Sequence, residues 1–67
     1  MVCIFLNGTQ HQAPPRATVA LLIESLGLVS EQVAVELNHV MVQRARHAEE
    51  RLQEGDRIEI VTLVGGG

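Results

Sequence analysis

The stretch that decides the fold is residues 52–67, which read LQEGDRIEIVTLVGGG. Gly55 and Asp56 form a turn signal, and the residues after them alternate in the two-residue period of a strand. One face of this strand carries Ile58 and Ile60, and the other carries Glu59, Val61 and Leu63. We therefore expect the last strand over residues 57–63, followed by a glycine tail over residues 64–67 that buries nothing.

Working outward, the rest of the chain predicts two hairpins around one helix. Asn7-Gly8 follows an apolar run over residues 2–6, so a hairpin with a second strand over 9–13 is expected before Pro14 and Pro15. Thr18 is a candidate N-cap, and the helical spacing of apolar residues predicts an amphipathic helix over 19–26. Strands over 32–38 and 40–42 follow. The polar segment over 44–52 has a modest apolar edge made of Ala45, Ala48 and Leu52.

These elements predict a single domain of the α+β class, because one helix covers one face of one sheet. The chain has 67 residues, and 46% of them are apolar. Phe5 is the only aromatic residue and Cys3 the only cysteine, so the core is aliphatic and carries no disulfide. One cysteine and three scattered histidines do not form a zinc framework, and we expect the histidines at the surface and Cys3 half-buried. A solvated surface is also expected for the carboxylates Glu24, Glu31, Glu49, Glu50, Glu54 and Asp56.

Charge and hydropathy narrow the classes of partner. The net charge is −3, and all five basic residues are arginines. Because no basic cluster is interleaved with aromatics, nucleic-acid binding is not expected, and a basic protein surface suits the chain better. No apolar run approaches the roughly 20 residues of a membrane span, and the first residues lack the features of a leader. We expect a cytoplasmic protein.

The terminal glycines are the candidate functional residues. A tail without side chains can thread a narrow channel, and Val64 to Gly67 reaches about 13 Å when extended. A terminal carboxylate is a poor electrophile until it is adenylated with ATP. The chemistry would then take place in a partner's active site, with this chain as the substrate.

The order of elements and the ending resemble small ubiquitin-like β-grasp proteins, and among them the ThiS sulfur carriers of thiamine biosynthesis. The resemblance covers essentially the whole chain and is most specific over residues 52–67. Its other matching residues are Asn7-Gly8, Thr18-Val19, Leu21-Leu22, Val33-Ala34-Val35, Asn38 and Arg44. It implies a β-grasp domain over 1–63, with one mixed sheet of four to five strands packed on one main helix, and a flexible tail over 64–67. Asn38-His39 stands where Asn-Gly is frequent, which implies a looser hairpin, and Gln43-Arg44 replaces a frequent Pro-Arg pair.

The resemblance also implies a mechanism. A ThiF-type enzyme would use ATP to adenylate the carboxylate of Gly67, and a persulfide sulfur donor would replace the AMP and leave a thiocarboxylate. Thiazole synthase would then take the sulfur. Gly65 and Gly66 would thread the partner's active site. The chain would be a carrier rather than an enzyme, would bind no cofactor itself and would be a monomer when free.

A docking surface is predicted at Phe5, Val61 and Leu63, which face away from the expected helix. Exposed apolar groups on a sheet are typical of such surfaces. Three other functions stay open. They are a sulfur carrier for another pathway, such as the small subunit of molybdopterin synthase, a protein modifier joined through Gly67 to lysines of its targets, and a β-grasp interaction module with an idle tail.

Overall fold

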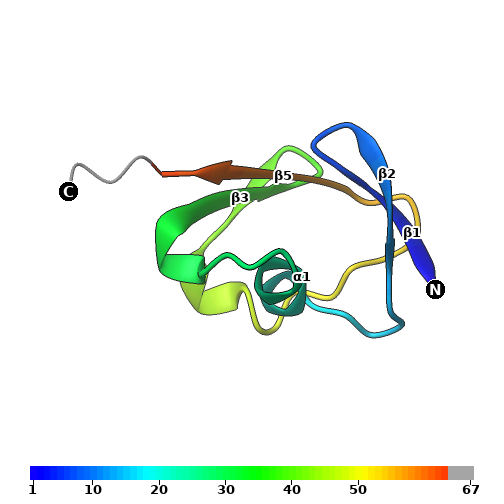
Figure 1. Cartoon of the computed structure of the whole chain (residues 1–67), viewed down its shortest axis with the longest axis horizontal. Helices are drawn as coiled ribbons and strands as arrows, with labels where there is room; N and C mark the ends of the chain where they lie inside the picture. Colours follow the sequence, from blue (N-terminus) through cyan, green and yellow to red (C-terminus); the bar gives the residue numbers. More distant parts are fainter. Residues whose placement is uncertain (64–67) are drawn as a thin grey trace.

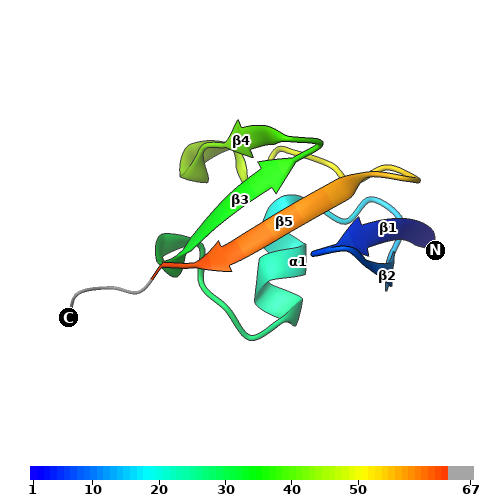
Figure 2. The same cartoon turned by 90° about the horizontal axis from the view of Figure 1, so that it is seen from above.

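The computed structural model describes residues 1–63 as two layers, one sheet and one helix (Figure 1). The sheet has five strands in the order β2-β1-β5-β3-β4. Figure 2 shows α1 behind the sheet, so the expected α+β arrangement of a mixed sheet on one main helix is confirmed. The elements are β1 (Val2–Leu6), β2 (Thr9–Ala13), α1 (Val19–Ser25), η1 (Ser30–Gln32), β3 (Val33–Leu37), β4 (Val40–Val42), η2 (Arg44–Arg46) and β5 (Arg57–Thr62).

The last strand, β5, occupies the centre of the sheet. It pairs parallel with β1 and antiparallel with β3. Ile58 and Ile60 are buried on its inner face, as the alternation predicts. Such a position requires apolar residues toward the helix and hydrogen-bonding partners on both edges, and β5 has both.

The helix is short and depends on packing. Thr18 caps it, because its Oγ1 accepts a hydrogen bond of 3.2 Å from the backbone N–H of Leu21. The predicted helix over 19–26 ends one residue earlier, at Ser25, and Gly27 follows with a φ of 74°. A helix of seven residues is not stable alone, so its buried side chains hold it against the sheet. Within residues 1–63, this structure contains no helix that could cross a membrane.

The core between the two layers is aliphatic, as the composition predicts. The largest side chains with almost no exposed surface are Ile4, Val19, Ile23, Val35 and Ile58. Leu52 joins them from the segment before β5, whereas Ala45 and Ala48 are exposed. The predicted apolar edge of the 44–52 segment is therefore wrong for the two alanines. The segment begins with a 3₁₀ turn, which does not keep the helical spacing that would align them.

His47 corrects the expectation that all three histidines lie at the surface. It is only 3% exposed, and its Nε2 lies 3.1 Å from the carbonyl oxygen of Val42. A carbonyl only accepts, so Nε2 donates, and Nδ1 accepts from the hydroxyl of Ser30 at 3.2 Å. Both ring nitrogens are satisfied, which explains how a polar side chain is tolerated in the interior. His39 is exposed as predicted, and His11 is half-buried.

Both hairpin turns are tight. Asn7 and Gly8 have φ values of 50° and 84°, and Asn38 and His39 have values of 52° and 71°. Positive φ at both central residues is what a two-residue type I′ turn requires. The expected looser hairpin at Asn38-His39 is therefore wrong: Leu37 pairs directly with Val40 across the turn. His39 adopts a backbone conformation that glycine accepts more readily.

The two turn asparagines hold the central strand. The side-chain amide of Asn7 donates to the carbonyl of Ile60 at 3.2 Å and accepts from the N–H of the same residue at 2.9 Å. On the other side, Oδ1 of Asn38 accepts from the N–H of Arg57 at 2.9 Å, and its Nδ2 donates to Asp56 at 3.0 Å. Asp56 is thus a half-buried structural carboxylate rather than the solvated one expected.

Candidate functional site at the outer sheet face

The sheet face turned away from α1, here called the outer face, is bounded at one end by the last described residues. It carries the outward side chains of β5 and of the strands beside it, namely Phe5, Ala34, Glu36, Arg57, Glu59 and Val61. Val61 is 60% exposed and Leu63 is 48% exposed. The N–H of Leu63 donates to the carbonyl of Gln32 at 2.8 Å, which fixes the chain at the point where it leaves the sheet.

Phe5 lies at the opposite end of the outer face. It pairs with Arg57 in the sheet register, and the Arg57 guanidinium lies 4.9 Å from the centre of its ring. Since Val61 is four residues further along β5, roughly 13 Å separates the two positions. The structure therefore places Val61 near the last described residue, Leu63, and Phe5 away from both. An open depression of about 590 Å³ connects the two ends, lined in part by Phe5, His39, Arg57, Glu59 and Val61.

The tail residues Gly65, Gly66 and Gly67 lie outside the described residues, and their roles remain predictions. The structure does show which element leads to them. The central strand β5 ends on the far side of the molecule from the N-terminus (Figure 1), and the tail residues follow it in the sequence.

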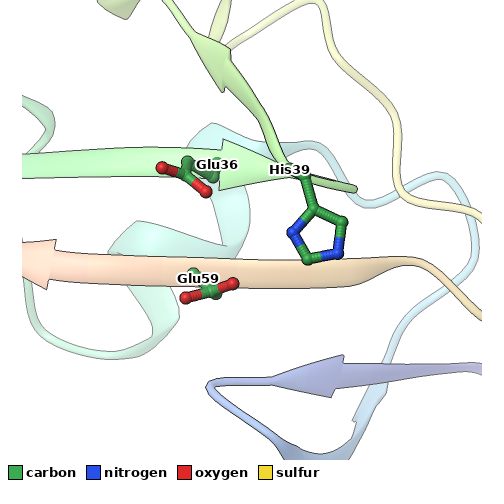
Figure 3. Close-up of side chains that lie close together, drawn as sticks. All are labelled: Glu36, His39 and Glu59. Carbon is green, nitrogen blue, oxygen red and sulfur yellow. The ribbon is translucent and has the colours of Figure 1, made fainter.

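Three polar side chains gather in the middle of the outer face, and sequence reasoning did not find them. Glu36 and Glu59 are directly opposite each other on β3 and β5, and His39 joins them from the β3–β4 turn (Figure 3). Their ligand-type atoms all lie within 4.8 Å of one another, and all three residues are exposed. They are the group among residues 1–63 whose chemistry could hold a metal ion. The alternation along the strand predicted that Glu36 lies on the face opposite Val33 and Val35. Only the pairing register of β3 with β5 shows that Glu36 lies beside Glu59.

The remaining candidate nucleophile, Cys3, is half-buried in β1, as expected. Its backbone N–H donates to the carboxylate of Glu54 at 2.9 Å. Because side chains two residues apart on a strand share a face, the Cys3 side chain lies on the same side of β1 as Phe5. A reactive thiolate requires an electropositive neighbour, whereas the contact shown for Cys3 is with an acidic residue.

The fold and the exit of the chain from a central strand define a ubiquitin-like β-grasp protein. The crystal structure of the thiamine biosynthesis protein ThiS from Geobacter metallireducens matches 98% of this chain and 100% of its own, with a TM-score of 0.81 and 26% identity. The solution structure of a thiamine biosynthesis protein from the same organism matches with a TM-score of 0.79 and 26% identity, over 98% of this chain and 88% of its own. The family model of the ThiS family matches residues 4–67, and the chain belongs to this family.

Curated relatives add a second kind of similarity. A thiazole synthase of Magnetococcus marinus is 44% identical over 64 residues, and one of Paramagnetospirillum magneticum is 36% identical over the same length. Each alignment covers 96% of this chain, which spans only 20% of those two relatives. The uncharacterized protein ycf40 of Pyropia yezoensis is 32% identical over 66 residues, covering 98% of this chain and 93% of the relative.

Proposed function

We propose that this protein is a sulfur carrier whose Gly67 carboxylate is converted to a thiocarboxylate that donates sulfur for thiazole formation in thiamine biosynthesis. The observation that carries the proposal is the match to the ThiS family, which extends to Gly67 itself. The position of β5 supports it, because the central strand leads directly to the glycines. The protein is a carrier acted on by enzymes and not itself an enzyme.

The proposed chemistry proceeds in three steps. The Gly67 carboxylate attacks the α-phosphorus of ATP in the active site of a ThiF-type enzyme and releases pyrophosphate. The terminal sulfur of a persulfide on a donor protein then attacks the acyl carbon and displaces AMP. A second thiol breaks the sulfur–sulfur bond, so that the thiol pair becomes a disulfide and the carrier keeps a thiocarboxylate. Gly65 and Gly66 lack side chains, which allows the tail to approach the walls of the partner's site.

The proposed partners are the ThiF-type adenylating enzyme, the persulfide donor and thiazole synthase. Two thiazole synthases contain a stretch similar to nearly all of this chain, which supports thiazole synthase as the acceptor of the sulfur. We propose that Phe5, Val61 and Leu63 contact these partners in turn, because they lie along the outer face up to the last described residue before the tail. Since ATP binds in the adenylating enzyme, the carrier requires no cofactor of its own.

The test is the intact mass of the protein after incubation with ATP, a ThiF-type enzyme and a sulfur source. The expected result is a gain equal to the replacement of one oxygen by one sulfur. A variant lacking Gly67 is the matched control and should gain nothing while unfolding like the parent. An unchanged mass in the parent protein, with an enzyme shown to be active on another carrier, would contradict the proposal. Branched Gly-Gly remnants on cellular lysines would instead identify a protein modifier.

A further inference from the structure

The centre of the outer face contains a feature that does not stabilise the free protein. Glu36 and Glu59 are exposed and directly opposite each other across β3 and β5. Like charges in this cross-strand position repel each other. Among the described residues, the one ion pair joins Arg46 to Glu50 at 3.8 Å, so neither carboxylate of the pair is neutralised by such a contact. The nearby Arg57 lies against the ring of Phe5 instead.

The carboxylate pair lies between the apolar residues of the predicted docking surface. Along β5, Glu59 stands between Arg57, beside Phe5, and Val61. On the other side of Glu36, the register places Met41, which is 68% exposed. A partner that covers both Phe5 and Val61 must therefore also cover the two carboxylates. Covering them with apolar or neutral groups would leave two charges buried and unpaired, which is strongly unfavourable.

We propose that the pair formed by Glu36 and Glu59 binds an arginine side chain of the partner protein. The pair is then the part of the docking surface that recognises a positive charge. This inference rests on the proposed function and names the chemistry of its partner. Two carboxylates on facing strands have Cβ atoms about 5 Å apart, a spacing that the planar fork of a guanidinium can bridge. The exposed side chains of Met41 and Val61 flank the site and can pack along the aliphatic stem of the arginine.

The chain's own basic side chains leave the pair without an ion-pair partner. His39 shares the group, with its ring within 4.8 Å of the carboxylates, but among residues 1–63 it forms no ion pair with either. Three of the five arginines are engaged elsewhere, and Arg57 lies 4.9 Å from the centre of the Phe5 ring. Arg44 reaches the carbonyl of Glu31 at 3.4 Å, and Arg46 reaches Glu50, both away from the pair. Binding of a partner arginine replaces repulsion by attraction. The pair therefore favours the complex over the free carrier and selects against neutral surfaces.

The test combines two measurements on the double variant Glu36→Gln/Glu59→Gln. The matched control is Glu24→Gln/Glu31→Gln, which removes the same charge from exposed residues on α1 and η1, in the other layer. With a ThiF-type enzyme, we expect the pair variant to raise KM for the carrier at least about tenfold with kcat unchanged, and the control to change KM by less than about twofold. The melting temperature of the free pair variant should rise by roughly 2–5 °C, because the repulsion is removed.

The outcomes separate this inference from the proposed function. Equal KM values for the pair variant and the control would overturn the arginine site, while a normal mass gain in both would leave the carrier function intact. Binding to the enzyme is also measured without ATP, so a wild-type carrier that binds but gains no mass contradicts only the carrier function. No binding by the wild type would overturn both proposals. Loss of wild-type binding on addition of EDTA would show that a metal ion, and not an arginine, occupies the pair.

Discussion

The side-chain amide of Asn7 forms two hydrogen bonds with the backbone of Ile60, as a neighbouring strand would. Removing this side chain should therefore destabilise the central strand. In Asn7→Gly, the N–H and the carbonyl of Ile60 both lose a partner at a half-buried site. A hydrogen bond contributes about 0.5–1.5 kcal/mol net, so the two together give a loss of about 2 kcal/mol. Glycine accepts the φ of 50° at this position, so backbone strain adds nothing to the loss.

The matched control is Arg16→Gly. Arg16 is exposed and also has a positive φ, of 67°. Its replacement by glycine therefore adds the same backbone flexibility without removing a hydrogen bond to β5. For a domain of this size, a loss of about 2 kcal/mol lowers the melting temperature by roughly 8–16 °C. The assay is thermal and urea unfolding followed by circular dichroism, because the chain contains no tryptophan or tyrosine. If Asn7→Gly and Arg16→Gly had the same melting temperature, the Asn7 amide would not stabilise the central strand.

Three further predictions concern single side chains. Ile60→Ala removes a buried side chain from β5 and should lower the free energy of unfolding by about 2–5 kcal/mol; a melting temperature equal to that of the parent would show that the inner face of β5 is wrongly assigned. His39→Gly relieves the positive φ of 71° and should stabilise the protein by about 0.5–1 kcal/mol, so a lower urea midpoint would contradict the strained turn. His47→Ala leaves Ser30 and Val42 without their buried partner and should cost about 2–3 kcal/mol in urea unfolding, whereas His11→Ala, in β2, should cost far less.

Much of the fold could be predicted because its determinants are local. The alternation around Ile58 and Ile60, the turn signal at Asn7-Gly8 and the cap at Thr18 each act within a few residues of the chain. The errors at Asn38-His39 and Asp56 concern contacts with other strands, and those in the 44–52 segment arose because the local pattern there was weak. The segment over 44–52 has no clear period, so neither the burial of His47 nor the exposure of its two alanines could be derived from it.

The candidate site divides in the same way. The glycine ending and the outward facing of Phe5 and Val61 follow from the residues themselves, since facing depends only on the strand period. The charge pair could not be derived, because Glu36 and Glu59 are distant in the chain. They become neighbours only when β5 enters the sheet beside β3.

The sequence by itself therefore determined the elements, the apolar face of each and the glycine ending, because hydrophobic period, capping and turn chemistry are properties of short segments. The tertiary structure alone decided the strand order, the asparagine bonds that hold β5, the burial of His47 and the meeting of the two carboxylates. Each of these joins residues that the chain separates. Their contact depends on how the sheet packs on the helix. The free energy of that packing comes from the whole core and not from any one segment.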